Sequence, residues 1–157
     1  MKIFSRPPET SVKHLLAESQ LAVSDLTIEH LEHFFGCGSA QTLEGVVGLE
    51  IYGSVALLRS LAVTPKSRGR GCGKALVGEA ERYAQSKGVY ALYLLTTTAN
   101  RFFERLGYQP VSRETAPESI RRTREFSDLC PSSSTFMVKR LPANRSLNTD
   151  AQKARTG

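Results

Sequence analysis

The segment that most constrains this chain is VTPKSRGRGCGKAL, residues 63–76. It follows an apolar stretch, contains three alternating glycines, and runs into a segment with the apolar periodicity of a helix. Glycine tolerates positive φ angles and lets the backbone approach a ligand closely. The free N–H groups at the start of a helix attract anions, because they lie at the positive end of the helix dipole. The segment therefore predicts a strand, a loop and a helix arranged around a polyanion such as pyrophosphate.

Two common phosphate-binding loops do not fit this segment. The P-loop requires Ser or Thr after its Gly-Lys pair, whereas Gly73-Lys74 is followed here by Ala75. Arg68 stands where the first glycine of that loop belongs. The dinucleotide fingerprint requires G-x-G-x-x-G, whereas the spacing here is G-x-G-x-G. The pattern that fits is R-x-x-G-x-G, formed by Arg68, Gly71 and Gly73, although a flexible basic turn without a ligand would have the same composition.

The remaining pattern predicts a mixed α/β (α+β) domain over residues 1–141. Gly53-Ser54 separates two stretches rich in Val, Leu and Ile, which is typical of a hairpin. Residues 142–157 lack apolar periodicity and are predicted to be a disordered tail. We expect helices over residues 9–20, 72–87, 99–106 and 119–129 and a short one after Thr27, with strands over 34–40, 43–52, 55–63, 89–95, 108–111 and 135–141.

A second motif, ANRFFERLGY at residues 99–108, follows the apolar strand predicted for residues 89–95. Together the two motifs resemble those of the GCN5-related N-acetyltransferase (GNAT) family, and the resemblance extends over roughly residues 7–141. It implies the GNAT fold, a central mixed and mostly antiparallel sheet that splays between its fourth and fifth strands and is flanked by helices. It also implies that acetyl-CoA is the acetyl donor and that an amine attacks it directly, without a covalent enzyme intermediate.

The resemblance assigns the cofactor contacts. The pantetheine arm would lie in the splay, Asn100 would lie beside the pantetheine or its thiol end, and Phe103 would be a further cofactor contact. Phe103 stands where the family often has a tyrosine, so it cannot protonate the leaving thiolate. The other implied contacts are the strand backbone at Leu61, Ala62 and Val63 and the pyrophosphate loop formed by Arg68, Gly69, Arg70, Gly71, Cys72, Gly73 and Lys74.

Strand parity predicts the catalytic face. A two-residue loop at 53–54 pairs Tyr52 with Val55 and places Glu50, Tyr52 and Arg59 on one face of the hairpin. We expect Glu50 to act as the base, Arg59 to anchor an acidic acceptor, and either Tyr52 or water to protonate the thiolate. A surface ion pair that contributes little would have the same pattern.

The acceptor is predicted from less standard segments. The strings GLEIYGSVALLRSLAV, LYLLTTTA and FSDLCPSSS are similar to acetyltransferases of bacterial arsenic-resistance operons and to amino-acid N-acetyltransferases. This resemblance implies a small acidic acceptor, either an amino acid or an amino-organoarsenical. Ser60 and Arg121 join Arg59 as predicted acceptor contacts. Cys130 by itself would be a weak arsenic ligand.

Charge and cysteine usage limit the partners. The chain of 157 residues has 21 Lys and Arg against 15 Asp and Glu, and residues 66–74 contain four of the basic residues and no acidic one. This charge predicts a polyanionic cofactor rather than nucleic acid, since no helix-turn-helix, zinc-finger or RNP pattern is present. Cys37, Cys72 and Cys130 have unrelated spacings, which predicts no disulfide scaffold, no metal site and a reducing cytoplasm.

Further expectations complete the functional hypothesis. The chain has no membrane-spanning stretch and no signal peptide at its start, so we expect no membrane partner. The family resemblance is compatible with a homodimer. Cys37 and Cys72 are expected to be packing residues. The alternatives to a small-molecule enzyme are a sensor that binds acyl-CoA without catalysis and an acetyltransferase that acts on a protein or peptide amine.

Overall fold

The computed structural model describes residues 2–131 and 133–142. The predicted tail therefore lies outside the described residues, apart from Pro142. A seven-stranded sheet runs through the molecule in the order β1-β2-β3-β4-β5-β7-β6. Its strands are β1 (Ile3–Ser5), β2 (Phe34–Gly38), β3 (Leu43–Tyr52), β4 (Val55–Val63), β5 (Ala91–Thr96), β6 (Gln109–Pro110) and β7 (Thr135–Arg140).

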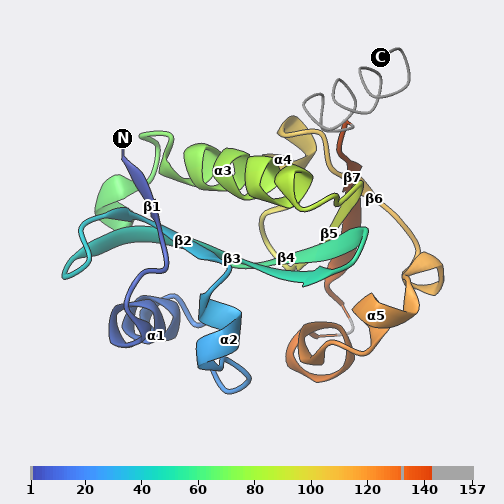
Figure 1. Cartoon of the computed structure of the whole chain (residues 1–157), viewed down its shortest axis with the longest axis horizontal. Coiled ribbons are helices and arrows are strands. Elements are labelled where there is room, and N and C mark those ends of the chain that lie inside the picture. The colour runs from blue at the N-terminus through green and yellow to red at the C-terminus, as the bar shows by residue number, and fades with distance from the viewer. Residues whose placement is uncertain (1, 132, 143–157) are drawn as a thin grey trace, which may run out of the picture.

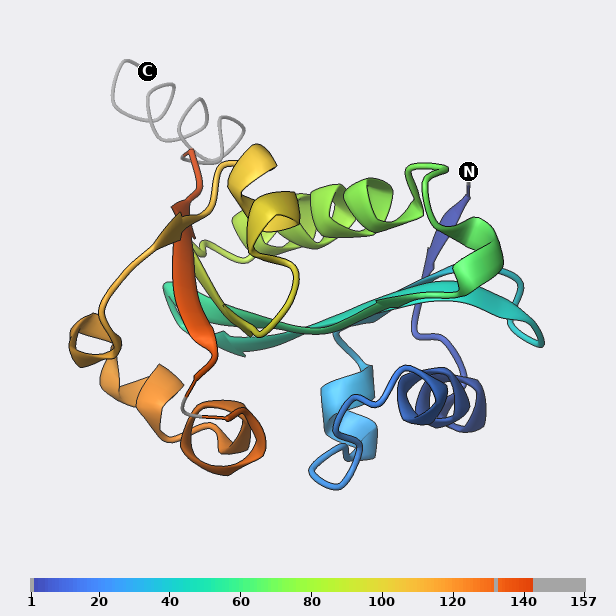
Figure 2. The same ribbon diagram turned by 180° about the vertical axis from the view of Figure 1, so that it is seen from behind.

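Among the strands of the described residues, only the β4–β5 pair is parallel, which confirms the predicted mixed and mostly antiparallel sheet. Helices cover both faces (Figures 1 and 2), with α3 and α4 on one face and α1, α2 and α5 on the other. The helical segments are α1 (Glu9–Glu18), α2 (Ile28–Leu31), η1 (Pro65–Ser67), α3 (Cys72–Ser86), α4 (Asn100–Arg105), η2 (Arg113–Thr115), α5 (Glu118–Arg121) and the π-helical turn η3 (Glu125–Leu129).

The core forms because the apolar stripe of α3 packs on the apolar strands. Leu76 and Ala80 of α3 are fully buried against Leu92 and Leu94 of β5 and Met137 of β7. A second buried cluster joins α1 to β2 and β3 on the opposite face. Burial on both faces explains why the sequence of β5 is an almost continuous apolar run.

The β3–β4 hairpin has the predicted register, with Tyr52 opposite Val55, Glu50 opposite Leu57 and Gly48 opposite Arg59. Further along, Val46 pairs with Ala62, so that residues 60 and 61 of β4 face residue 47 alone. This β-bulge places Ser60 in the left-handed region with a φ of 58°. The bulge interrupts the β3–β4 ladder at residues 60 and 61, and pairing resumes at Ala62.

The predicted splay lies on the other side of β4. Pairing between β4 and β5 is limited to three positions, where residues 55–57 face residues 91–93. The later residues of β4 and β5 are not paired with each other, so the backbone of β4 from Leu58 onwards is open toward the splay. A strand edge of this kind can hydrogen-bond to an extended ligand.

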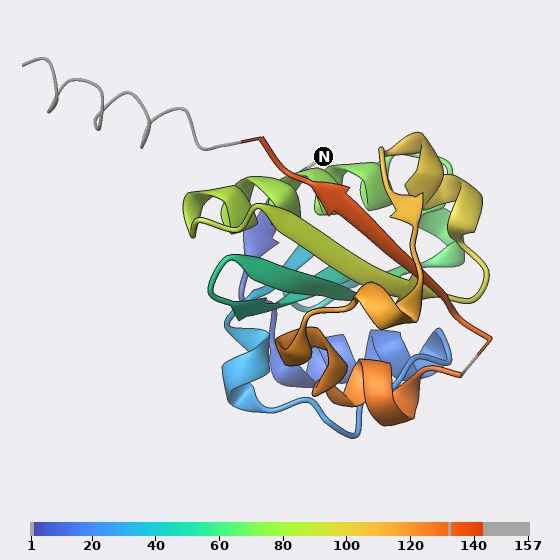
Figure 3. The same ribbon diagram turned by 90° about the vertical axis from the view of Figure 1, so that its right-hand side faces the viewer.

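The segment predicted as one helix over residues 119–129 is interrupted. The hydroxyl of Thr123 donates to the Ile120 carbonyl at 2.7 Å and accepts from the Phe126 N–H at 3.2 Å. These bonds compete with the helical ladder, and the chain restarts as η3. In Figure 3, η3 and α5 lie on the same side of the sheet as α1 and α2. The short strand β1 was also not predicted.

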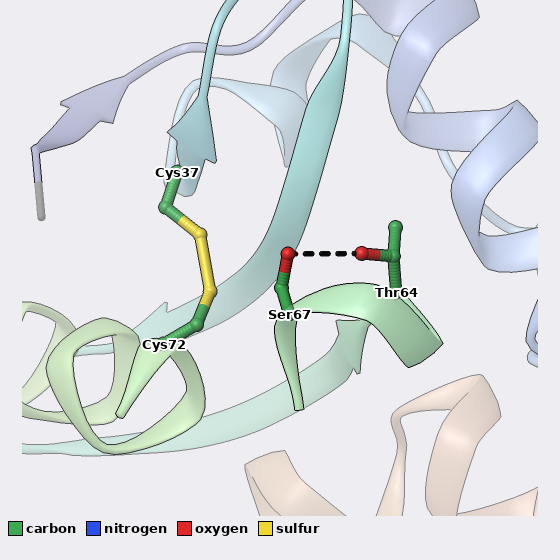
Figure 4. The surroundings of a disulfide bond; sticks show 4 residues. All are labelled: Cys37, Thr64, Ser67 and Cys72. Atoms are coloured by element: carbon green, nitrogen blue, oxygen red, sulfur yellow. Dashed lines mark hydrogen bonds between the residues drawn. A yellow bond between two sulfur atoms is a disulfide. The ribbon is translucent and has the colours of Figure 1, made fainter. Parts of the chain in front are cut away.

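Cys37 and Cys72 form a disulfide, so the prediction that these cysteines only pack was wrong (Figure 4). They are 35 residues apart in sequence, and the fold brings the end of β2 against the first turn of α3. Gly45 leaves the necessary room, because a Cβ there would lie 2.5 Å from the Cys72 sulfur and 3.0 Å from that of Cys37. Cys130 is the free cysteine of the described chain.

Within the described residues, no helix has the length and apolar character needed to cross a membrane. The same part of the chain has no group of three or more His, Cys, Asp or Glu side chains placed to hold a metal ion.

Candidate active site

A cavity of about 430 Å³ lies where β4 and β5 separate. The bulged part of β4 forms one wall, and the end of β5 with the turn after it forms another. Segments from the opposite face, before α2 and after α5, complete it. The lining residues are 20–22, 58–61, 94–99 and 129–131 together with Phe103, Glu125 and Ser134.

The glycine-rich loop connects β4 to α3 with the conformation that the sequence predicts. Gly69 and Gly71 have φ angles of 79° and 85°, a region that side chains rarely adopt. Gly71 is the N-cap of α3, and no side chain caps the helix. The N–H groups of the first turn therefore remain available to an anion. The basic side chains of residues 66–74 are all exposed around them.

The start of this loop is held by a short hydrogen-bonded turn, shown beside the disulfide in Figure 4. The Thr64 hydroxyl donates to the Ser67 hydroxyl at 3.1 Å. The Arg68 Nε donates to the Val63 carbonyl at 3.2 Å, so this arginine folds back on the end of β4. The side chain of Cys72 points into the disulfide, which leaves only its backbone for contact with an anion.

The second predicted cofactor segment packs against the first. A Cβ at Gly73 would lie 3.2 Å from the ring of Phe102, so the absence of a side chain lets α4 approach α3. Phe103 is buried and lines the cavity. Asn100 does not line it. Its Nδ2 donates to the Thr135 hydroxyl at 2.8 Å, while its Oδ1 is buried without a hydrogen-bond partner in the part of the chain that the structure describes.

Arg59 is the centre of a buried ion cluster at the cavity wall, with a side chain that is 0% exposed. Both terminal nitrogens donate to Asp25, with an Nη2–Oδ1 distance of 2.8 Å. Nη1 also donates to Glu50 Oε2 at 2.8 Å, and Nε donates to the Ser60 hydroxyl at 3.0 Å. Glu125 Oε1 lies 3.0 Å from Nη2. One cation thus faces three carboxylates, which gives the cluster a formal charge of −2.

Glu50 and Tyr52 form a pair at one end of this cluster. The Tyr52 hydroxyl donates to Glu50 Oε1 at 2.5 Å, and the Nε2 of His30 lies 3.8 Å from the same oxygen. Neither Glu50 nor Tyr52 lines the cavity, from which Arg59 separates them. The carboxylate that does line the cavity is Glu125, whose Oε2 accepts a hydrogen bond from the Cys130 thiol at 3.0 Å.

The cluster shifts the pKa values of its members in opposite directions. Burial by itself raises the pKa of Asp25, but the hydrogen bond and charge of Arg59 outweigh it and hold that pKa below its ordinary 3.8. Burial raises the pKa of the Tyr52 hydroxyl, and Glu50 raises it further, so this hydroxyl remains protonated at neutral pH. Burial and then the hydrogen bond to Glu125 raise the pKa of Cys130 to about 12.

Residues 2–108, more than half of the chain, match the acetyltransferase (GNAT) family. The chain belongs to this family. An uncharacterized N-acetyltransferase of Chlorobaculum tepidum is 34% identical over 96 residues, which cover 60% of this chain and 61% of that protein. The match thus spans less than two thirds of that relative.

Solved structures show that this GNAT chain has the family fold. N-acetylglutamate synthase from Neisseria gonorrhoeae, complexed with coenzyme A and N-acetyl-glutamate, has a TM-score of 0.77 at 22% identity. This similarity covers 90% of this chain and 35% of the synthase. Rv2747 from Mycobacterium tuberculosis, in complex with CoA and NLQ, has a TM-score of 0.72 at 18% identity. This similarity covers 90% of this chain and 100% of the Rv2747 chain.

The predicted acceptor contacts Arg121 and Arg59 differ in their positions. Arg121 is exposed and its guanidinium donates to the backbone carbonyls of Glu114 and Ala116, so it stabilises its own loop and does not line the cavity. Arg59 lines the cavity as predicted, but the protein's own oxygens already surround its guanidinium. Any ligand oxygen at Arg59 therefore competes with these protein oxygens.

Tyr108 does not line the cavity. Its hydroxyl is buried and donates to Glu81 on α3 at 2.9 Å, and Lys139 binds the other oxygen of the same carboxylate at 2.9 Å. Tyr52 differs from Tyr108, because its hydrogen bond to Glu50 connects it to the ion cluster around Arg59.

Sequence reasoning missed Asp25, Glu125 and Ser134. Asp25 lies between two short helices, with no pattern that connects it to β4. Glu125 directly precedes the string FSDLCPSSS and Ser134 ends it, but their own residue types carried no signal there.

Proposed function

We propose that this chain is an acetyl-CoA-dependent N-acetyltransferase that transfers acetyl directly to the amine of a small molecule. The observation that carries the proposal is the continuous path from the uncapped start of α3, along the open edge of β4, to the carboxylate cluster at the cavity. This path has the order of groups that CoA and an amine require. The CoA ligands of the solved GNAT structures support the same cofactor.

In this proposal the pyrophosphate binds the loop from Arg68 to Lys74. The first-turn N–H groups of α3 and the exposed basic side chains supply donors and positive charge. The two amide groups of pantetheine pair with the backbone of Leu61, Ala62 and Val63, where β4 has no partner in β5. Phe103 contributes an apolar surface beside the thioester.

The chemistry requires a neutral amine, a polarised thioester carbonyl and a proton for the thiolate. The amine nitrogen forms a bond to the acetyl carbon, the C–S bond breaks, and the electron pair stays on sulfur. Glu50 takes the proton that the amine loses, and Tyr52, which is hydrogen-bonded to Glu50, or water returns a proton to the thiolate. Because neither side chain lines the cavity, both transfers run through a water molecule. The raised pKa keeps the Tyr52 hydroxyl protonated at neutral pH, and it also makes this hydroxyl a weaker acid than a thiol. Tyr52 can therefore give up its proton only as Glu50, protonated by the amine, supplies another one to the phenol oxygen.

The acceptor in this proposal is an amino acid or an amino-organoarsenical. The resemblance to arsenic-resistance and amino-acid N-acetyltransferases supports this class, as does the N-acetyl-glutamate ligand of the Neisseria synthase. The formal charge of −2 at the cluster favours an amine that arrives as an ammonium ion and loses its proton at the site.

A panel of amines tests the proposal through release of free CoA from acetyl-CoA. The panel contains L-glutamate, phosphinothricin, an amino-arsenical, neutral alkyl amines and a lysine-containing peptide. Acetylation of an amine with an oxyanion supports the small acidic acceptor. Acetylation of the peptide alone supports a protein substrate, and CoA binding without turnover supports a sensor, for which Phe103 in the tyrosine position is the relevant feature.

Glu50→Gln tests the base. Its kcat should fall about 100-fold or more, the contribution of a positioned base, while the affinity for acetyl-CoA stays unchanged. Glu29→Gln is the matched control, because Glu29 is exposed on α2. Equal losses of kcat and acetyl-CoA affinity in Glu50→Gln would assign Glu50 a structural role.

A further inference from the structure

The three carboxylates around Arg59 do not hold it equally. Asp25 accepts hydrogen bonds from both terminal nitrogens, and Glu50 accepts one from Nη1. Glu125 Oε1 lies 3.0 Å from Nη2, but no aligned N–H···O hydrogen bond joins the two side chains in the described structure. The second N–H of Nη2 is therefore the one donor of Arg59 without a well-aligned partner.

Glu125 also differs from the other two carboxylates in its position. Its side chain is 13% exposed, against 4% for Asp25 and 6% for Glu50. It is the only acidic residue among those that line the cavity in the described structure. It begins the π-helical turn η3 and is not part of the sheet. Of the three, Glu125 can leave Arg59 with the smallest disturbance to the core.

Electrostatics determines how an oxyanion can enter this site. The cluster already has a formal charge of −2, so a fourth carboxylate would add repulsion at a buried position. Exchange of one carboxylate for another leaves the charge at Arg59 unchanged. Glu125 can move toward solvent, where its charge is hydrated.

A second, independent observation points to a ligand oxygen in the same cavity. Ser134 lines the cavity and is 6% exposed, and within residues 2–131 and 133–142 its hydroxyl has no hydrogen-bond partner. Buried hydroxyl groups are normally paired, because an unpaired one has lost its bonds to water without replacement. An oxyanion in the cavity would accept from this hydroxyl.

We infer that Glu125 is a specificity-determining residue whose carboxylate occupies the position on Arg59 that the oxyanion of the acceptor takes. The acceptor class is then an amine that carries a carboxylate or a similar oxyanion, which displaces Glu125 and binds Arg59 Nη2 and the Ser134 hydroxyl. The inference rests on the proposed function for its acceptor. It reconciles the predicted anchoring role of Arg59 with the crowded guanidinium of the unliganded protein.

The test measures binding of L-glutamate to the CoA-loaded protein by isothermal titration calorimetry, for the wild type and for Glu125→Gln. Removal of the competing charge should lower the Kd for L-glutamate about tenfold, the equivalent of about 1.4 kcal/mol. L-Glutamine and L-glutamic acid α-amide each lack one carboxylate. One of these two amides lacks the carboxylate that displaces Glu125. That amide should bind the wild type and Glu125→Gln with the same Kd.

Glu118→Gln is the matched control, because Glu118 is 68% exposed on α5 and pairs with Arg122. It should leave every Kd unchanged. An unchanged or higher Kd for L-glutamate in Glu125→Gln overturns the inference, as does an equal gain for all three ligands or the absence of L-glutamate binding to both proteins. Tighter binding without CoA release in the turnover assay would uphold the inference and overturn the proposed enzymatic function.

Discussion

Replacement of Arg59 by Leu tests whether the ion cluster holds the two halves of the site together. The Arg59 side chain is 0% exposed, and its carboxylate partners Asp25 and Glu50 are 4% and 6% exposed. Loss of one partner from a buried ion pair costs about 3–5 kcal/mol, because the remaining charge is left unpaired. A domain of this kind has a total stability of about 5–15 kcal/mol, so the loss is a large part of it.

The assay is urea unfolding at pH 7 and at pH 4, with thermal unfolding as a second measure. We expect Arg59→Leu to lose about 4 kcal/mol at pH 7. This corresponds to a decrease in Tm of about 10 °C for a chain of this length. Arg122→Leu is the control, because Arg122 is 77% exposed and its pair with Glu118 should contribute less than about 0.5 kcal/mol.

The pH dependence has a defined sign. In the wild type Arg59 lowers the pKa of Asp25 below 3.8, so its stabilising contribution is fully present above pH 3.8 and is lost as the pH falls further. Without Arg59 the buried carboxylates are more easily protonated, and protonation relieves their repulsion. The difference in stability between the two proteins should therefore be smaller at pH 4 than at pH 7. A loss below about 1 kcal/mol at pH 7 would refute the reasoning, as would a difference that does not narrow at pH 4.

Three further predictions concern the cysteines and one close contact. Cys130, whose pKa is raised to about 12, should react with iodoacetamide at pH 8 far more slowly than an ordinary thiol, and its rate should rise with pH up to about 12; the rate of an ordinary thiol would contradict this. Reduction of the Cys37–Cys72 disulfide should destabilise the chain by about 3–4 kcal/mol, the entropic value for a loop of this size, measured by urea unfolding with and without dithiothreitol. Gly48→Ala should cost about 1–3 kcal/mol, because its Cβ would lie 2.2 Å from the ring of Phe34; an unchanged urea midpoint would exclude that clash.

The sequence by itself determined the features that depend on neighbouring residues. The two-residue turn at Gly53-Ser54 sets the hairpin register, because side chains alternate between faces with a period of two. The alternation alone therefore assigns Glu50 and Arg59 to one face of the hairpin. The conformation of the loop from Arg68 to Lys74 could also be predicted from the sequence, because positive φ angles favour glycine and the following helix has a regular apolar stripe.

The tertiary structure alone decided how the site is completed. Asp25 reaches Arg59 from 34 residues away, and Cys37 reaches Cys72 from 35 residues away. Glu125 arrives on a turn where Thr123 interrupts a segment with helical periodicity. Sequence periodicity describes which face of an element is buried, but not which residue of a distant element meets it. Which distant residue contacts a given side chain depends on how the helices pack on the two faces of the sheet. This packing brings Asp25 and Glu125 to Arg59, which is therefore the centre of a buried cluster and not a free anchor.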